Sequence, residues 1–360
     1  MIKFHKLVVS DVRKETADSI SVAFDVPADL QNEYAFIQGQ HLTLKLTVKG
    51  QEVRRSYSIC SPATSSGVKE PLRVAIKRVK DGLGSNFIND NIKKGDSIEV
   101  MTPNGHFYSE LKPTNKKHYV LFAGGSGITP MMSIIRTTLI VEPQSKLTLF
   151  YGNYNEDACI FKKEIDDLAA ANPGRITVHH IYDKPKTAGH PAEFTGMLTK
   201  EVVKNLWNKH VERNPVIEYF ICGPGPMMEN VKQVLEDSNV NKHFIHIEYF
   251  TAAIEEPKKT ADSKGGVVSE VTVIMDGKET TFQLATSGQH ILDAAMDAGV
   301  DTPFSCKGGV CATCRAKLLE GKVEMDMNYA LTDDEVASGY ILTCQSHPTT
   351  PTVIVDYDQG

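Results

Sequence analysis

The sequence predicts a multidomain fold of three parts: an antiparallel β-barrel over residues 1–112, a parallel α/β sheet over residues 113–250 and a small α+β module over residues 268–360. Three observations support this prediction. The first part consists of short runs rich in Val, Ile, Leu and Thr separated by turns, which is typical of antiparallel barrels. The second part alternates apolar strands with helices. The third part holds four of the seven cysteines of this 360-residue chain.

The strands expected in the first part are short and regularly spaced. Glycine-containing turns at 80–84 and 102–105 separate some of them. The runs are SISVAFDV (19–26), HLTLKLTV (41–48), PLRVAIKRV (71–79) and DSIEVM (96–101).

The pattern changes near Pro113, where continuous apolar runs begin to alternate with amphipathic segments. This alternation indicates a parallel sheet of the nucleotide-binding type, covered by helices. We expect strands over 118–123, 146–152, 176–182, 218–223 and 243–250, and helices over 131–140, 162–170, 199–207 and 226–238.

Residues 251–267 (TAAIEEPKKTADSKGGV) lack periodicity and predict a flexible linker. After it, a hairpin is expected over 270–284 with Asp276 and Gly277 at its turn. A helix over 290–299 ends at Gly299, and 351–357 is a final strand.

The composition excludes several classes of protein. A formal net charge of −6 and a pI of about 6.1 lack the basic footprint of nucleic-acid-binding proteins. No apolar run is long enough to cross a membrane, and the charged N-terminus does not resemble a signal peptide. Cys60, Cys159 and Cys222 are scattered and do not form a secreted disulfide framework, so we expect a cytoplasmic protein.

The charge is unevenly distributed along the chain. Residues 268–360 hold 14 Asp and Glu against 5 Lys and Arg, a net −9, whereas residues 1–267 carry a net +3. This asymmetry is typical of a partner-docking surface and equally of a small, well-solvated domain.

The cysteines of the third part have the spacing of a plant-type 2Fe-2S cluster. Cys306, Cys311 and Cys314 follow C-x4-C-x2-C, and Cys344 lies further along the chain. Four thiolates are required because each iron binds two of them, and the glycines at 308 and 309 let the loop wrap the cluster. The alternative is a zinc site, but zinc sites favour two closely spaced pairs and Cys344 has no nearby partner in sequence.

A flavin motif is suggested in the first part by the run Arg55-Ser56-Tyr57-Ser58, between a strand and a turn. An arginine can bind a diphosphate oxygen through paired hydrogen bonds, and a tyrosine ring can stack on an isoalloxazine. The run could also be an ordinary polar strand end. Gly84 and Ser85 follow in GLGSNFI, where backbone N–H groups near a helix start suit a phosphate.

Two further motifs lie at strand ends of the second part. The run GGSGITP places Gly125, Gly127 and Thr129 between a strand and a helix, where glycines allow the backbone to approach a diphosphate. It is not the G-x-G-x-x-G fingerprint. The run CGPGPM, which contains Cys222, Gly223, Pro224 and Met227, follows another strand. Taken alone, Cys222 is a buried thiol at a strand end, and most such thiols are inert.

The order of these motifs resembles the ferredoxin–NADP reductase superfamily over about residues 1–250, and FSCKGGVCATCRAKLLEGKV with ILTCQSHP resembles a plant-type ferredoxin domain of β-grasp fold. The resemblance implies FAD, a 2Fe-2S cluster, and NADPH or NADH as cofactors. It implies hydride transfer near Ser58, Cys222 and Glu248, with Phe250 covering the flavin ring. The implied FAD contacts are Arg55, Ser56, Tyr57, Ser58, Ala75, Ile76, Lys77, Gly84 and Ser85.

The choice of nicotinamide nucleotide is predicted from the loop after the strand at 146–152. Many relatives have an arginine where this chain has Tyr154, and arginine helps to bind a 2′-phosphate. Because Glu156 and Asp157 follow, the sequence favours NADH.

The three cofactors together predict an electron splitter. A nicotinamide donates two electrons as a hydride, a 2Fe-2S cluster accepts one, and a flavin can do both. The domain order is similar to that of oxygenase reductases, and the resemblance implies a di-iron, multisubunit oxygenase as partner. The alternatives are a redox-sensing module, in which the cluster signals rather than delivers electrons, and a reductase serving desaturases or general acceptors.

Overall fold

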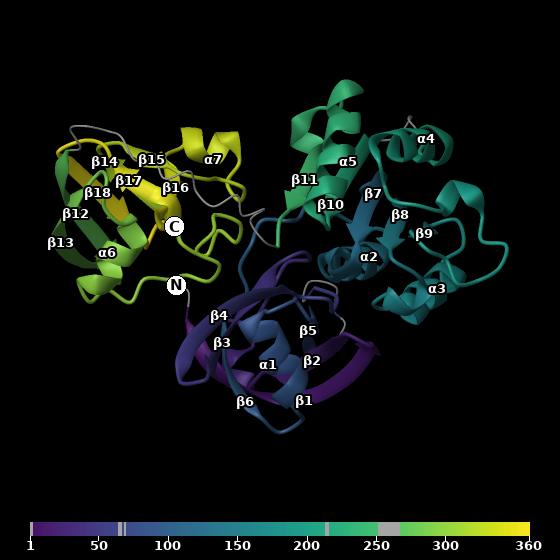
Figure 1. The fold of residues 1–360 in the computed structure, drawn as a ribbon, viewed down its shortest axis with the longest axis horizontal. Coiled ribbons are helices and arrows are strands. Elements are labelled where there is room, and N and C mark those ends of the chain that lie inside the picture. The colour runs from purple at the N-terminus through teal and green to yellow at the C-terminus, as the bar shows by residue number, and fades with distance from the viewer. Residues whose placement is uncertain (1–2, 64–66, 68–69, 213–215, 251–266) are drawn as a thin grey trace. The chain divides into compact units, whose positions relative to one another are not determined.

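The computed structural model describes residues 3–63, 67, 70–212, 216–250 and 267–360 (Figure 1). The chain divides into two compact units. One unit spans Phe4–Glu248, and the other combines Tyr249–Gly360 with the start of the chain.

The first unit begins with a six-stranded antiparallel sheet of order β4-β3-β6-β1-β2-β5. An antiparallel bridge joins Ile59, directly after β4, to Val74 in β5, so the two ends of the sheet approach each other. The elements are β1 (Phe4–Thr16), β2 (Ser19–Asp25), a 3₁₀ turn at Ala28–Leu30, β3 (His41–Val48), β4 (Gln51–Ser58), β5 (Leu72–Lys77), α1 (Leu83–Asn91) and β6 (Ser97–Met101).

Alternating residues of these strands fill one apolar core. Leu42 and Leu44 of β3 are fully buried, as are Val74 and Ile76 of β5, because successive side chains of a strand point to opposite faces. Helix α1 contacts β3, β4 and β5 and adds Ile88 to the same core. The antiparallel sheet predicted for this part is confirmed.

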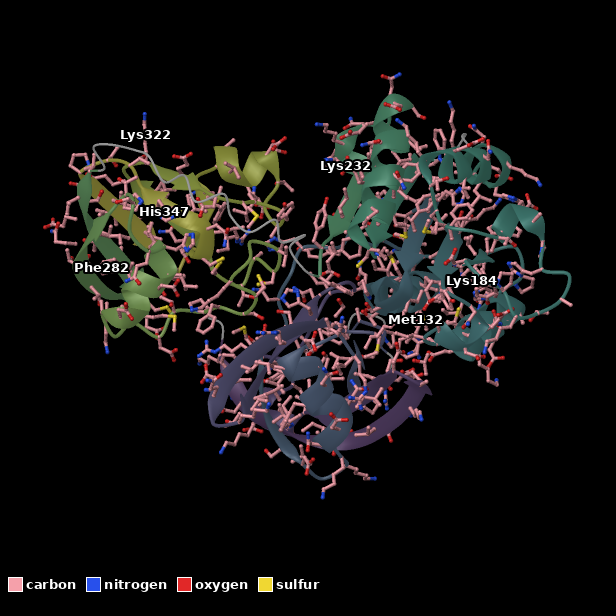
Figure 2. All side chains as sticks on the ribbon, viewed as in Figure 1. Met132, Lys184, Lys232, Phe282, Lys322 and His347 are labelled. Atoms are coloured by element: carbon pink, nitrogen blue, oxygen red, sulfur yellow. The ribbon has the colours of Figure 1, made fainter. Side chains whose placement is uncertain are left out.

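The first unit continues as a five-stranded parallel sheet of order β11-β10-β7-β8-β9, which confirms the predicted α/β arrangement. Met132 lies in its core, whereas Lys184 is at the surface (Figure 2). The elements are β7 (Lys117–Gly124), α2 (Ile128–Val141), β8 (Lys146–Asn153), α3 (Lys162–Ala171), β9 (Ile176–Tyr182), α4 (Lys200–His210), β10 (Val216–Cys222), α5 (Gly225–Asp237) and β11 (Ile245–Glu248).

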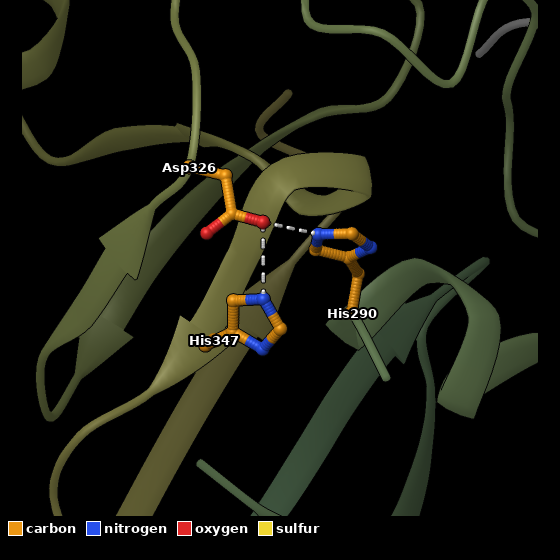
Figure 3. Close-up of side chains that lie close together, drawn as sticks. All are labelled: His290, Asp326 and His347. Atoms are coloured by element: carbon orange, nitrogen blue, oxygen red, sulfur yellow. Dashed lines mark hydrogen bonds and ion pairs between the residues drawn. The ribbon is translucent and has the colours of Figure 1, made fainter. Parts of the chain in front are cut away.

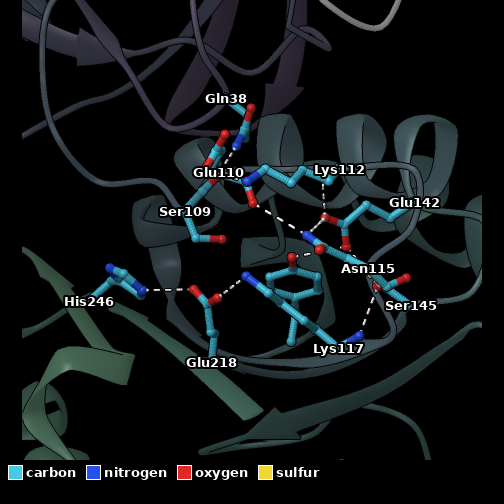
Figure 4. Close-up of polar contacts among 11 residues, drawn as sticks. Gln38, Ser109, Glu110, Lys112, Asn115, Lys117, Glu142, Ser145, Glu218 and His246 are labelled. Carbon is cyan, nitrogen blue, oxygen red and sulfur yellow. Dashed lines mark hydrogen bonds and ion pairs between the residues drawn. The ribbon is translucent and has the colours of Figure 1, made fainter. Parts of the chain in front are cut away.

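Two buried carboxylates form hydrogen bonds and ion pairs with residues in and around the start of β7 (Figure 4). Glu142 follows α2 and accepts hydrogen bonds from the Tyr119 hydroxyl, the Ser145 hydroxyl, the Asn115 amide and the Lys112 N–H. Glu218 of β10 pairs with Lys117 and His246. Burial would raise the pKa of Glu218, but these two partners lower it to about 2, so the carboxylate stays ionised.

The second unit contains a five-stranded mixed sheet of order β13-β12-β18-β14-β16 and a two-stranded sheet of β15 and β17. The hairpin turn at Asp276-Gly277 is confirmed, since both residues have positive φ. The elements are β12 (Val268–Met275), β13 (Lys278–Ala285), α6 (Ile291–Asp297), β14 (Arg315–Glu320), β15 (Val323–Met325), α7 (Asp333–Ala337), β16 (Tyr340–Leu342), β17 (Ser346–Pro348) and β18 (Thr352–Asp356).

Some predictions differ from the structure, and one concerns residues that the structure does not describe. The strand-like runs of the sequence do not include the long strand β1, and Arg55–Ser58 lies inside β4 rather than after a strand. Residues 251–266 of the predicted linker lie outside the described residues. No helix in the described part of the chain is long and apolar enough to cross a membrane.

Candidate active site

The flavin motif and its glycine loop come together in the first sheet. Arg55 and Tyr57 share one face of β4, and Gly84 in the first turn of α1 lies directly against them. A Cβ added to Gly84 would meet the Arg55 Cγ at 3.0 Å and the Tyr57 hydroxyl at 3.6 Å. The glycine is therefore needed for α1 to approach this face of β4.

The start of α1 offers donors for a phosphate. The N–H of Asn86 donates to Gly82 O at 3.3 Å and begins the helical ladder, so the N–H groups just before Asn86 have no acceptor within the helix. Ser85 is buried and its hydroxyl accepts a hydrogen bond from Val79 N at 3.1 Å. N–H groups of this kind beside the Arg55 guanidinium suit a diphosphate.

Strand β5 carries the expected Ala75, Ile76 and Lys77 next to this site. Ala75 and Ile76 are buried, and the Lys77 ammonium ion-pairs with Asp18 at 3.6 Å. The same ammonium lies 3.9 Å from the position of a Cβ on Gly125, so β5 reaches the nucleotide loop.

The two glycine-rich loops of the nucleotide domain pack backbone to backbone. Gly127 leads into α2, and a Cβ on it would lie 2.0 Å from the carbonyl oxygen of Cys222. Gly125 adopts φ +52°, and a Cβ on Gly223 would meet Gly124 at 2.9 Å. Because β7 and β10 are neighbouring parallel strands, their carboxyl ends bring these loops together, where a nucleotide binds in open α/β sheets.

The other residues predicted for this site also lie in the two loops. The Thr129 hydroxyl donates to Ser126 O at 3.0 Å, which closes the first turn of α2. Pro224 precedes α5, and Met227 lies in its first turn with its sulfur 2.8 Å from a Cβ on Gly124. These contacts leave no room for a larger residue at Gly124, Gly127 or Gly223.

Ser58, Cys222 and Glu248 are brought together by the fold. The Ser58 hydroxyl donates to the Glu248 carboxylate at 3.2 Å, across 190 positions of sequence. Cys222 and Glu248 are register partners at the ends of β10 and β11. The sequence motifs contain all three residues but could not reveal the hydrogen bond that joins the flavin sheet to the nucleotide sheet.

The environment of this trio favours uncharged side chains. Desolvation raises the pKa of Glu248 to about 8, although the hydrogen bond from Ser58 opposes it. Burial also raises the pKa of the fully buried Cys222 thiol, and the charge of Glu248 adds to the effect. Cys222 is therefore a neutral thiol rather than a nucleophilic thiolate.

The four cysteines of the second unit form two pairs. Interaction with the Cys311 thiol and N–H donation from Gly308, at 3.3 Å from the Cys306 sulfur, lower the pKa of Cys306. Interaction with Cys314 likewise lowers the pKa of Cys344. Two pairs of thiols with backbone donors fit a two-iron cluster, because each iron takes two cysteines.

A glycine and a glutamine lie next to the cysteines in the sequence and make close contacts there. Gly309 has φ +72°, and a Cβ there would lie 3.0 Å from Met327 O. The Gln345 amide donates to Lys307 O at 3.0 Å, and its nitrogen lies 3.8 Å from the Cys344 sulfur. Gln345 was not predicted, and its position directly after Cys344, a predicted ligand, was the available signal.

Two expectations concern the edges of the site. Phe250 is 39% exposed and belongs to the second unit, so its place over a flavin ring stays a prediction. Tyr154 is 55% exposed, and the Lys184 ammonium lies 5.3 Å from the centre of its ring. Glu156 accepts hydrogen bonds from Lys186 N and Thr187 N, and Asp157 pairs with Lys186. Both acids therefore have partners within the protein, and the choice of NADH over NADPH stays a prediction.

Three family models match consecutive parts of the chain. An oxidoreductase FAD-binding domain matches residues 6–108, an oxidoreductase NAD-binding domain matches 121–233, and a 2Fe-2S iron-sulfur cluster binding domain matches 273–349. These matches confirm the kinds of cofactor expected from the sequence: FAD, a nicotinamide nucleotide and a 2Fe-2S cluster.

Curated relatives share this arrangement over nearly their whole length. A subunit of the 1,2-phenylacetyl-CoA epoxidase of Escherichia coli is 38% identical, over 99% of both chains. The ferredoxin reductase component of 3-ketosteroid-9-alpha-monooxygenase from Rhodococcus rhodochrous is 34% identical, over 98% of this chain and 96% of the relative.

A solved structure shows the same fold. Phthalate dioxygenase reductase, described as modular for electron transfer from pyridine nucleotides to 2Fe-2S, aligns with a TM-score of 0.58 and 24% identity over 98% of both chains. At this identity the likeness concerns the fold alone. On the strength of its curated relatives, the chain belongs to this family of FAD-, NAD- and 2Fe-2S-binding reductase components and is an oxidoreductase.

Proposed function

We propose that this protein takes hydride from NADH or NADPH and delivers single electrons through its 2Fe-2S domain to an oxygenase component. The observation that carries the proposal is the hydrogen bond from Ser58 to Glu248, beside Cys222, because it joins the flavin motif to the end of the nucleotide sheet. Bound FAD supplies the conversion of a two-electron hydride into single electrons.

In this proposal the residues of the first unit bind and orient. Arg55 and the N–H groups at Gly84 and Ser85 hold the FAD diphosphate, while the Tyr57 ring packs on the flavin. The loops at Gly125–Gly127 and Cys222–Met227 hold the nicotinamide nucleotide. Glu248 holds a proton near neutral pH, and Ser58 orients its carboxyl group.

In the second unit, Cys306, Cys311, Cys314 and Cys344 hold the 2Fe-2S cluster in this proposal. The support is the pairing of the four thiols and the N–H donor of Gly308. The match of the 2Fe-2S domain model, which spans all four cysteines, supports the same assignment.

We further propose that the partner is the di-iron, multisubunit oxygenase of phenylacetyl-CoA epoxidation, in phenylacetate degradation. The support is the 38% identity to the epoxidase subunit over 99% of both chains, against 34% for the ketosteroid reductase and 29% for a glycine betaine monooxygenase reductase subunit from Chromohalobacter salexigens. We also propose a cytoplasmic location, which is supported by seven cysteines that form no disulfide.

The proposal is tested by reconstitution with purified oxygenase components. We expect NAD(P)H oxidation coupled to epoxidation of phenylacetyl-CoA when the chain is mixed with the epoxidase oxygenase subunits. Coupled turnover only with the ketosteroid oxygenase would contradict the proposed partner but would agree with the proposed reductase function. Failure to reduce any oxygenase, with rapid reduction of a desaturase, would contradict both levels of the proposal.

A further inference from the structure

A second cluster of metal-ligating side chains lies in the second unit, apart from the four cysteines (Figure 3). His290, Asp326 and His347 offer one ligand atom each, and these atoms all lie within 4.8 Å of one another. Among the described residues, no other group of three or more such side chains meets this condition.

Both histidine rings direct Nε2 at the same carboxylate oxygen of Asp326. Nε2 of His290 lies 2.9 Å from Oδ2 of Asp326, and Nε2 of His347 lies 3.3 Å from the same oxygen. The two imidazole rings are 4.5 Å apart between centres. With metal–ligand bonds of about 2.0–2.2 Å, the donor atoms of a tetrahedral zinc site lie about 3.3–3.6 Å apart, so only small side-chain movements are needed to admit an ion.

Regular structure holds all three positions. His290 is the N-cap residue of α6, although its side chain makes no capping hydrogen bond, and α6 contacts β17. His347 lies in β17 opposite Glu324 of β15, and the N–H of Asp326 donates to Gln345 O at 2.8 Å. The ligands are therefore fixed before an ion binds, which lowers the cost of ordering them.

The electrostatic setting favours a cation. In the part of the chain that the structure describes, Asp326 has ion pairs only with the two histidines, so no lysine or arginine neutralises it. The surrounding module, residues 268–360, carries a net −9.

We propose that His290, Asp326 and His347 form a binding site for a divalent transition-metal ion of the zinc class, separate from the 2Fe-2S cluster. Two imidazoles and one carboxylate are ligands that zinc accepts, and they leave a fourth position open to water or a partner group. Side-chain exposures of 18–34% give an ion access from solvent.

The test is isothermal titration of the full-length protein, with FAD and cluster in place and adventitious metal removed by a chelator, using Zn²⁺ as the probe. We expect one Zn²⁺ per chain. The Zn²⁺ affinity should fall by at least roughly 10–100-fold in His290→Gln and in Asp326→Asn. That is the loss caused by removing a hydrogen-bond partner of a metal ligand, and losing the ligand itself should cost no less. The control His243→Gln, an exposed histidine of the other unit, should bind as the wild type does.

Two substitutions keep the test decisive if one variant fails to fold, since the cluster absorbance reports whether the module is intact. Zinc-edge X-ray absorption should show nitrogen and oxygen ligands with two imidazoles. Zn²⁺ affinity unchanged in His290→Gln would overturn the proposal. So would a sulfur shell near ~2.3 Å, which would place zinc on the cysteines.

Discussion

The carboxyl group of Glu248 makes the stability of the first unit depend on pH. Its pKa of about 8 in the folded chain exceeds the ordinary value of 4.5. Between these values the folded state binds more protons than the unfolded state, so stability falls as the pH rises through this range and the loss is complete above pH 8.

We therefore expect Glu248→Gln to remove part of the loss of thermal stability between pH 5 and pH 9. A shift of one pKa unit corresponds to about 1.36 kcal/mol, and partial exposure of the side chain reduces the effect, so several degrees of melting temperature are expected. Melting curves followed by the fluorescence of released flavin would measure it. An unchanged pH slope in the variant would contradict the assignment.

Cys344 is the one of the four clustered cysteines that lies outside the 306–314 loop. Replacing it in Cys344→Ser should abolish the visible bands of the cluster and lower the iron content from about two per chain, because one iron would lose a thiolate. Cys159→Ser, a buried cysteine outside the module, is the matched control and should retain both irons. Iron analysis and absorbance spectra of the purified variants give the answer.

From the sequence we expect Tyr154 to stand where an arginine would bind the 2′-phosphate of NADPH. Tyr154→Arg should raise the ratio of kcat/KM for NADPH over NADH by about tenfold, which corresponds to about 1.4 kcal/mol of added charge-assisted binding. Tyr154→Phe should leave the ratio unchanged. If the arginine variant also leaves it unchanged, the 2′-position of the nucleotide does not lie at Tyr154.

At the scale of elements, the nucleotide site depends on the close packing of two loops after β7 and β10. Gly127→Ala would place a methyl group 2.0 Å from Cys222 O, so one loop must move. We expect a loss of roughly 10–100-fold in kcat/KM for the nicotinamide donor, because a displacement of about 1 Å can cost on the order of 100-fold. The matched control is Gly225→Ala, since its Cβ meets nothing within 4 Å.

The elements of the parallel sheet were predictable because each is a continuous apolar run with a clear start and end. Strand β1 was not, because its 13 residues include five charged side chains and one histidine, and only Leu7, Val9 and Thr16 are buried. Its pairing with both β2 and β6, with register shifts, is a tertiary property that no local pattern contains. Helix α7 was not predicted, although the sequence contains the capping box of Thr332 and Glu335 that begins it.

The candidate site was predictable residue by residue but not as an assembly. Gly84, Gly127 and Cys222 stand in short motifs that a sequence displays directly. The hydrogen bond between Ser58 and Glu248 depends on how two sheets pack, as does the meeting of His290 with Asp326 and His347. Such contacts join residues far apart in the chain, so motif spacing gives no access to them.

At the scale of the whole molecule, the chain combines two units with different tasks and different charges. The first holds the flavin and nucleotide sites in our proposal, and the second holds the cluster. Residues 268–360 carry a net charge of −9, against +3 for residues 1–267. We expect electrons to pass from a nicotinamide through both units within one chain.

An anaerobic absorbance titration of the purified protein with NADPH and, separately, with NADH tests this claim most directly. We expect flavin and 2Fe-2S bands that both bleach, with about three electrons taken up per chain, two on FAD and one on the cluster. A protein that stays colourless after addition of FAD and reconstitution of the cluster, or a cluster that stays oxidised while the flavin is reduced, would contradict it.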